Sequence, residues 1–332
     1  MKVSLIVSVY NEEDVLPLFW EEVQRVVPTV EDTTFEIVWV NDGSIDGSQA
    51  CIEAVVGGAA SHPSISHQTI EFSRNFGHEA AMIAGIDHAS GDVVVCLDSD
   101  LQHPPSCLPD MVRAHRDGFD IVTMVRESRA DKRNTQRASS WFYRLLNALS
   151  DFHFEANASD FFLISHRVAD ILRTNFRERN RFLRGYVQTL GFDKTSLSYD
   201  AGARAAGESK YRIAGLLNLA SIAIFSFSRK PLYAAMALSL VFFLVTMAVG
   251  GYSLWVYFFG DAPPAGYTTL VVFLSLSFTM LFFVLGVLSM YIGRGVEEIQ
   301  ERPIYLIKER RSVGSFGSPN AERQTTPNLN DA

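Results

Sequence analysis

Short apolar runs alternate with amphipathic stretches along the first 125 residues of the chain. The apolar runs, rich in Val, Ile and Phe, cover residues 3–9, 35–40, 69–72, 93–97 and 121–125. Helical spacing of apolar residues occurs between them, at residues 13–27, 48–56, 79–89 and 106–116. Strands that alternate with helices predict an α/β domain whose mostly parallel, Rossmann-like sheet is covered on both faces. In such sheets ligands bind beyond the carboxyl ends of the strands.

Two later segments, residues 231–260 and 262–293, contain no Asp, Glu, Lys or Arg, and only Asp261 separates them. A helix needs about 20 apolar residues to cross the hydrocarbon core of a membrane, and each segment is longer. Two buried core helices are the alternative, but soluble domains seldom carry uncharged segments of this length. We therefore predict two transmembrane helices.

Basic residues lie before the first segment and after the second, but not in the loop between them. Arg229 and Lys230 precede the first segment, whereas the loop around Asp261 carries no basic residue. The basic residues after the second segment are Arg294, Arg302, Lys308, Arg310 and Arg311. Because Lys and Arg favour the cytoplasmic side, we expect an inner (plasma) membrane protein with two spans and both termini in the cytoplasm.

These patterns divide the chain into four parts. Residues 1–210 form the cytoplasmic α/β domain, and 211–230, with an apolar stripe from Ile213 to Phe225, form a juxtamembrane amphipathic helix. Residues 231–293 are the two-helix membrane domain, and 294–332 are a cytoplasmic tail with a disordered, Ser- and Pro-rich end. Another apolar stripe, Trp141, Leu145 and Leu149, fits a core helix and an interfacial helix equally well.

Composition narrows the class of protein further. Of 332 residues, 48% are hydrophobic and 20% charged, below the usual ~25% charged of soluble domains. The net charge of −8 argues against nucleic-acid binding. The three cysteines, Cys51, Cys96 and Cys107, form no CxxC pair, which suits a reducing compartment. The first apolar run lacks a signal-peptide cleavage site and a following GxGxxG, so we expect neither a signal peptide nor a dinucleotide cofactor.

Three predicted strands end in acidic motifs. They are Tyr10-Asn11-Glu12-Glu13, Asn41-Asp42-Gly43-Ser44 with Asp46-Gly47, and Asp98-Ser99-Asp100-Leu101-Gln102. Two carboxylates at i and i+2 after a buried strand can converge on a hard cation, and Gln102 adds an oxygen. Such an ion neutralises a departing diphosphate. A carboxylate at Asp42 or Asp46 can accept hydrogen bonds from a nucleoside, although by itself each fits a turn or helix cap better.

In this order the motifs resemble the family-2 nucleotide-sugar glycosyltransferases of the GT-A fold. Over roughly residues 1–311 the chain is also similar to the polyprenyl-phosphate branch of that family. The matching segments include FSRNFGHE at 72–79, WFYRLLN at 141–147, GESKY at 207–211 and YIGR at 291–294. This branch includes bactoprenol (undecaprenyl-phosphate) glucosyltransferases and dolichyl-phosphate mannosyltransferases. In its length and its two predicted spans, the chain is most similar to the bactoprenol group.

The resemblance implies a donor site and a metal site. Tyr10, Glu12 and Asp42 would hold the nucleoside, and Asp98 would contact the nucleotide or the metal. Asp100 and Gln102 would ligate Mg²⁺ or Mn²⁺. Lys210, with Arg204 upstream, would fold over the donor diphosphate. The family usually has Pro at the position of Ser8, a departure that we expect to leave the fold intact.

The resemblance also implies an acceptor site. Arg126, Arg137 and Ser140 would bind the lipid phosphate, and guanidinium groups suit phosphate oxygens, although a basic run alone is usually a solvated face. Asp160 would be the catalytic base or the carboxylate that orients the acceptor. A phosphate monoester is largely dianionic near neutral pH, so we expect orientation to be its larger role. Phe162 replaces a frequent Arg, which leaves the loop around Asp160 without an expected salt bridge.

We therefore expect an inverting, metal-dependent transfer of a hexose from a nucleotide sugar, UDP-glucose first, to a polyprenyl phosphate at the cytoplasmic membrane face. Direct displacement at the anomeric carbon needs no covalent intermediate. Alternatives are a processive polysaccharide synthase, for which the chain lacks a Q-x-x-R-W motif and further spans, and a non-catalytic nucleotide-sugar scaffold. A flippase is disfavoured because neither span contains an ionisable residue of the charged types. Gly250 and Gly251 offer helix-packing surfaces for a homo-oligomer.

Overall fold

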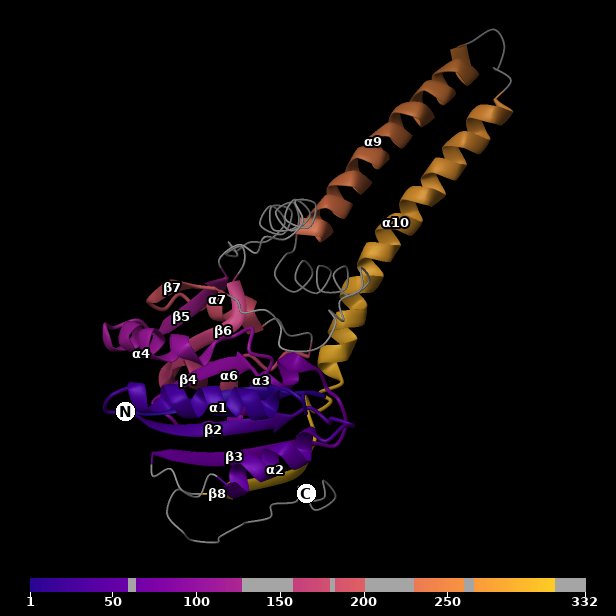
Figure 1. Cartoon of the computed structure of the whole chain (residues 1–332). Coiled ribbons are helices and arrows are strands. Elements are labelled where there is room, and N and C mark those ends of the chain that lie inside the picture. Colours follow the sequence, from indigo (N-terminus) through magenta and orange to yellow (C-terminus); the bar gives the residue numbers. More distant parts are fainter. Residues whose placement is uncertain (59–63, 127–157, 180–182, 201–229, 260–265, 314–332) are drawn as a thin grey trace. The chain divides into compact units, whose positions relative to one another are not determined.

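A computed structural model describes residues 1–58, 64–126, 158–179, 183–200, 230–259 and 266–313 (Figure 1). It separates into two compact units. The sheet unit contains residues 1–140, 154–212 and 303–332, and the helical unit contains residues 141–153 and 213–302. The predicted amphipathic helix at 211–230 and the stripe at 141–149 lie outside the described residues, apart from Lys230.

Eight strands form one sheet in the described part of the chain, in the order β7-β5-β6-β4-β1-β2-β3-β8. Their bounds are β1 Lys2–Val9, β2 Thr34–Asn41, β3 Ile65–Phe72, β4 Val93–Asp98, β5 Ile121–Arg126, β6 Ala158–Ser165, β7 Lys194–Tyr199 and β8 Ile307–Val313. The pairs β1–β2, β1–β4, β2–β3 and β5–β7 are parallel, whereas β6 and β8 pair antiparallel with their neighbours. The predicted α/β sheet is confirmed.

Helices cover both faces of the sheet, as Figure 1 lets the reader follow. They are α1 Leu16–Val26, α2 Ser48–Gly58, α3 His78–His88, α4 Leu108–Arg116, α6 His166–Asn175 and α7 Leu183–Thr189, with short 3-10 turns at Val27–Thr29 and Pro105–Cys107. The main core packs α1, α2 and α4 against one face. The α3 helix packs on the other face so closely that a Cβ at Gly85 would lie 2.2 Å from the Ile6 side chain. Burial on both faces explains why the central strands are apolar without alternation.

The register of the central strands aligns their carboxyl ends. Ser8 pairs with Val40 on β2 and with Asp98 on β4, and Val9 pairs with Asn41. The three acidic motifs therefore emerge along one edge of the sheet, where the sequence predicts the ligand site.

Three strands were not predicted. The β6 strand inserts antiparallel between β4 and β5, so Asp160 lies on a strand and not in the loop that the sequence suggests. The β7 strand extends one edge of the sheet beyond β5. The predicted tail at 294–332 also contains structure, because β8 pairs with β3 at the other edge. The β8 strand reads IKERRSV, and a short strand with this many charged residues gives a weak sequence signal.

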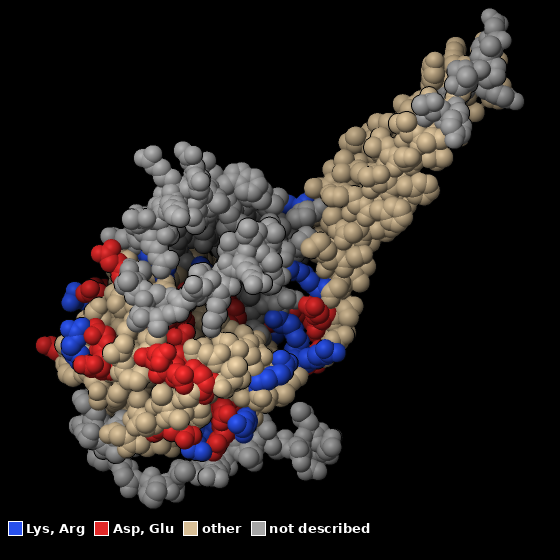
Figure 2. Space-filling view, turned by 45° about the vertical axis from the view of Figure 1, so that its right-hand side comes forward, with Lys and Arg blue, Asp and Glu red and all other residues tan. Residues whose placement is uncertain are grey.

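The helical unit contains α9, Lys230–Phe259, and α10, Tyr267–Ile299, close to the predicted 231–260 and 262–293. Phe242 of α9 stacks on Phe273 of α10, with 6.2 Å between ring centroids. Segments Leu232–Val256 and Thr269–Ile299 are long and apolar enough to cross a membrane, and almost none of their most apolar windows is buried. Figure 2 shows no acidic or basic residue along the visible length of these helices between their ends.

Candidate active site

The loop after β4 carries two of the predicted carboxylates. Asp100 is buried, and both of its oxygens accept hydrogen bonds from Gln102, from the backbone N–H (3.0 Å) and from Nε2 (2.9 Å). The Gln102 Oε1 in turn accepts from Nη2 of Arg126, at the end of β5 (3.2 Å). Leu101, between Asp100 and Gln102, has a φ of +61°. This left-handed backbone turns the chain tightly enough for the Gln102 amide to reach the Asp100 carboxylate. The loop thus joins three predicted residues, Asp100, Gln102 and Arg126.

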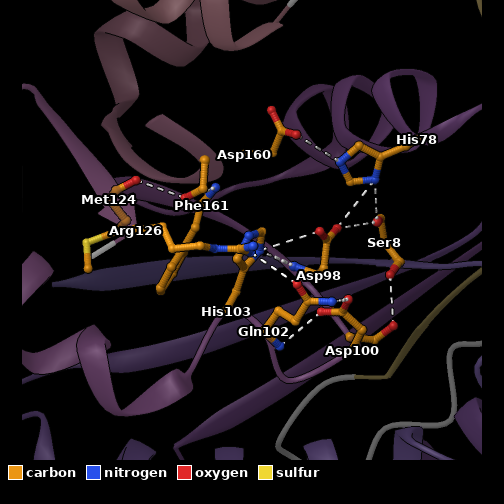
Figure 3. A network of polar contacts seen from close by, with 12 residues as sticks. Ser8, His78, Asp98, Asp100, Gln102, His103, Met124, Arg126, Asp160 and Phe161 are labelled. Atoms are coloured by element: carbon orange, nitrogen blue, oxygen red, sulfur yellow. Dashed lines mark hydrogen bonds and ion pairs between the residues drawn. The ribbon is translucent and has the colours of Figure 1, made fainter. Parts of the chain in front are cut away.

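Asp98 lies between two histidines and a serine, as Figure 3 shows. Ser8 Oγ donates to Asp98 Oδ1 (3.2 Å), and His78 Nδ1 lies 3.4 Å from the same oxygen. His103 Nδ1 accepts the backbone N–H of Asp98 (3.1 Å), and its ring stacks on Phe161. Ser8 is therefore more than a neutral replacement for Pro, because its hydroxyl touches a predicted donor-site carboxylate.

His78 connects this group to Asp160. His78 begins α3, and its Nδ1 lies 3.0 Å from Ser8 Oγ while its Nε2 lies 3.9 Å from Asp160 Oδ2 (Figure 3). Arg184 of α7 makes a two-point contact with Asp160, from Nε to Oδ1 and from Nη2 to Oδ2, both at 3.1 Å. Asp160 thus has the salt bridge that the replacement of Arg by Phe162 puts in doubt, but the arginine comes from α7.

These contacts determine the charges of the network. Burial opposes ionisation of Asp160, but Arg184 and His78 outweigh it and lower the pKa of this carboxyl. Burial likewise opposes the imidazolium of His78, yet Asp98 and Asp160 raise its pKa. Burial lowers the pKa of His103. Glu79 is different, because burial and the charge of Asp160 raise its pKa to about 7. At neutral pH the network therefore keeps Asp160 ionised.

Asp42 lies at the neighbouring strand end and organises the loop after β3. Its buried carboxylate accepts the backbone N–H groups of Phe76 (2.7 Å) and Gly77 (2.9 Å), while burial raises its pKa. Gly43 has a φ of +65°, and a Cβ there would lie 2.4 Å from the Arg74 carbonyl carbon. Only glycine fits such a close approach of two loops.

The β1–α1 and β2–α2 loops are also joined to each other. The backbone N–H of Glu12 donates to Ser48 Oγ (2.8 Å). Asp46 accepts from both the N–H and the hydroxyl of Ser48, the first residue of α2, as the turn-and-cap alternative predicts. Tyr10 is exposed at this rim. Tyr10, Glu12 and Asp42 thus lie on two loops that share one edge of the sheet.

The carboxylates of Asp98 and Asp100 suit Mg²⁺ or Mn²⁺, which in such sites binds one or two carboxylates and completes its shell with substrate phosphates. Gln102 suits it less well, because its carbonyl faces the Arg126 guanidinium and its N–H faces Asp100. Rotation of the amide would place like groups against each other. Within the described ranges, no group of three or more His, Cys, Asp or Glu side chains is arranged to hold a metal ion.

The structure therefore brings most of the predicted residues together and adds several. Asp98, Asp100, Gln102, Arg126 and Asp160 share one network. Arg137, Ser140, Arg204 and Lys210 lie outside the described residues and stay predictions. His78, Glu79 and Arg184 were not among the predicted site residues. His78 and Glu79 belong to the quoted 72–79 segment, so a signal was present, whereas nothing local marks Arg184.

Comparison with known proteins identifies the family of this chain. A model of the family described as Glycosyl transferase family 2 matches residues 4–174. The uncharacterized glycosyltransferase YkcC of Bacillus subtilis is 34% identical, covering 93% of this chain and 94% of its own. The SfII prophage-derived bactoprenol glucosyl transferase of Shigella flexneri is 36% identical, covering 93% of this chain and 98% of its own.

A distant likeness also exists among solved structures. Glucosyl-3-phosphoglycerate synthase from Mycobacterium tuberculosis, in complex with Mn²⁺, UDP-glucose and phosphoglyceric acid, is 16% identical with a TM-score of 0.45. The match covers 68% of this chain and 77% of that one. The family match and the two relatives, together with the mixed sheet and its acidic rim, establish that the chain belongs to glycosyl transferase family 2 and is a glycosyltransferase of the GT-A fold.

Proposed function

We propose that this enzyme transfers a hexose from a nucleotide sugar, UDP-glucose first, to a polyprenyl phosphate at the cytoplasmic face of a membrane. One observation carries the proposal: a continuous set of polar contacts joins Asp98, on the expected donor side, to Asp160, on the expected acceptor side, through His78. The relatives named bactoprenol glucosyl transferase support both the sugar and the lipid.

The donor would lie along the edge formed by the ends of β1, β2 and β4. Asp42 would meet the nucleoside, together with Tyr10 and Glu12. Asp98 and Asp100 would hold Mg²⁺ or Mn²⁺, which when bound supplies positive charge against a leaving diphosphate. Arg204 and Lys210 would close over the diphosphate.

The acceptor phosphate would approach from the side of Asp160 and Arg126, with Arg137 and Ser140 as further contacts. Asp160 is held ionised by Arg184, so it is a weak proton acceptor near neutral pH. The acceptor phosphate needs little deprotonation, because its second pKa lies near ~6. Asp160 would therefore orient the acceptor by accepting a hydrogen bond from a phosphate oxygen that still carries a proton, and the anomeric carbon would be inverted by direct displacement.

The two apolar helices support a membrane location for the acceptor. Their apolar side chains are largely exposed, which is unfavourable in water and favourable in a lipid bilayer. The basic residues at their outer sequence flanks favour cytoplasmic termini and an inner-membrane location. Assembly into a homo-oligomer is part of the same proposal.

The test is thin-layer chromatography of lipid products from membranes containing the full chain, undecaprenyl phosphate and one radiolabelled nucleotide sugar at a time. We expect a labelled lipid with UDP-glucose, ahead of UDP-N-acetylglucosamine, UDP-galactose and GDP-mannose. Asp100→Asn should reduce transfer at least about 100-fold, since it removes a ligand of the metal that would stabilise the charge of the leaving diphosphate. A chelator should abolish transfer, and Mg²⁺ or Mn²⁺ should restore it.

Asp110→Asn is the matched control, because Asp110 is an exposed carboxylate of α4 that pairs only with Arg113 at the surface among the contacts described. It should leave transfer unchanged. Absence of a labelled lipid with every donor would contradict the proposed function. Full transfer after chelation would contradict the metal site alone, and a long polymer as product would favour the synthase alternative.

A further inference from the structure

In the described part of the chain, Asp160 forms ion pairs of different geometry with His78 and Arg184. His78 Nε2 lies 3.9 Å from one oxygen, which is an electrostatic contact and not a hydrogen bond. Arg184 meets both oxygens at 3.1 Å. A planar guanidinium that binds both oxygens of a carboxylate restricts its rotation as well as its position. Arg184 is therefore the group that determines how the Asp160 carboxylate is turned.

No arginine of β6 can supply this contact. Asp160 and Phe162 lie on the same face of the strand, because side chains alternate along it. Phe162 is only 1% exposed and packs on the side of the sheet away from the main core, which holds Phe161 and Leu163. The position two residues after Asp160 is thus filled by an apolar side chain, and the cation comes from α7.

The α7 helix is itself held in place on this side of the site. Leu183, Tyr186 and Val187 are buried, and the Tyr186 ring packs on Phe176 with 5.1 Å between centroids. The backbone N–H of Leu183, which precedes Arg184, donates to Glu79 Oε2 (2.9 Å). Glu79 follows His78 in α3, so α3 contacts both the acceptor carboxylate and the helix that carries its arginine.

We propose that Arg184, placed by the contact between Glu79 and α7, is a positioning residue that sets the orientation of Asp160 toward the acceptor phosphate. The inference rests on the proposed function, because it takes Asp160 as the group that meets the acceptor. It predicts a larger loss in the transfer step than in donor binding, because the two-point contact of Arg184 is with Asp160, on the expected acceptor side.

The experiment uses the full chain in membranes and the lipid-product assay. In Arg184→Ala, kcat should fall about 100-fold, as expected when a reacting group is misplaced by roughly 1 Å, while KM for the nucleotide sugar stays near the wild-type value. Millimolar guanidinium should restore part of kcat in Arg184→Ala. Arg184→Lys keeps the positive charge but cannot bind both carboxylate oxygens as a guanidinium does. Its kcat should therefore lie between those of the wild type and Arg184→Ala.

Arg167→Ala is the matched control. Arg167 also makes a two-point contact, with Asp120, but on the outer surface of α6 and with 61% of its side chain exposed. It should leave kcat unchanged, with or without guanidinium. Undiminished kcat in Arg184→Ala would overturn the assignment, and so would a loss that guanidinium leaves unchanged in a variant with the wild-type melting temperature. Failure of the wild-type chain to label any lipid would instead overturn the proposed function.

Discussion

Apolar side chains are buried in the sheet unit of this protein and largely exposed in its helical unit. In the sheet unit, Leu5 of β1 is fully buried, with strands on both sides and helices on both faces. In the helical unit, Leu276 of α10 is 56% exposed and Phe282 is 66% exposed. Water accounts for the first arrangement, because burial of apolar area stabilises a fold. The second is unfavourable in water and is consistent with helices that lie in a membrane.

The difference also explains where polar groups are tolerated. The sheet unit buries Asp42, Asp100 and His103 at one edge, where neighbouring loops satisfy them. In α9 and α10, hydroxyl groups such as those of Ser239, Thr246 and Ser277 donate to backbone carbonyls four residues earlier. Such internal bonds are what a helix in lipid requires, since lipid offers no partner.

The largest effect should come from one substitution made in both units. Leu5→Ala should lower the free energy of unfolding by about 2–5 kcal/mol, because it removes buried contacts and leaves a cavity. Leu276→Ala should change it by less than about 0.5 kcal/mol in detergent, as at other exposed sites. Urea unfolding of the full chain, followed by tryptophan fluorescence, measures both. Equal losses would show that α10 packs against protein on this face.

A smaller effect should follow acidification, through His67 in the sheet unit. Burial lowers the pKa of His67 to about 4, against ~6.5 in an unfolded chain. Below pH 6.5 the unfolded state therefore binds a proton that the folded state does not, and the free energy of unfolding falls until about pH 4. The expected loss by pH 4.5 is roughly 2–3 kcal/mol.

His67→Gln is the control for this prediction, since it retains an acceptor for Trp39 Nε1–H, which now donates to His67 Nδ1 (3.2 Å). In the variant, the free energy of unfolding should lose the part of its pH dependence that comes from His67. The part that comes from His88 should remain, because burial also lowers the pKa of His88 to about 4. An unchanged pH profile in melting experiments would contradict a buried, neutral His67. The α9 and α10 helices contain no histidine and contribute nothing to this effect.

The smallest effect should come from Tyr305, where the chain rejoins the sheet unit after α10. Its hydroxyl donates to Asp87 Oδ2 (2.7 Å), and its ring stacks on Phe72. Tyr305→Phe keeps the stacking and loses the hydrogen bond, which should cost about 1 kcal/mol in thermal unfolding. Tyr233→Phe, at an exposed tyrosine of α9, is the matched control and should cost nothing measurable. Equal melting temperatures for all three proteins would contradict an anchoring role for this hydrogen bond.

Much of the architecture could be predicted from local patterns. Five strands and four helices of the first 125 residues were placed within a few residues, and so were the two long apolar helices. The predicted helix at 13–27 starts later, at Leu16, because Pro17 suits the first turn of a helix and the preceding residues serve the β1 loop. The strands β7 and β8 were missed because they are short and polar, and β6 was missed because the segment around Asp160 was interpreted as a loop.

The candidate site divides in the same way. Asp98 and Asp100 could be found because both follow one apolar run, and their place at the strand end is a local property. The link from Asp98 to Asp160 through His78 could not be found, because it depends on β6 lying beside β4. Phe162 shows the same limit. The sequence suggests that Asp160 lacks a salt bridge because Phe162 replaces an Arg, but Arg184 of α7 supplies one.

By itself, the sequence determined the order of strands and helices in the first 125 residues, the two charge-free segments and the acidic motifs at the strand ends. These depend on periodicity, charge and spacing among neighbours in the chain, which act before any tertiary contact forms. Only the tertiary structure decided which cation meets Asp160, 24 residues away in sequence, and that Tyr305 returns to Asp87, 218 residues earlier. Such contacts depend on how whole elements pack against one another, and no local pattern encodes which distant partner a side chain will meet.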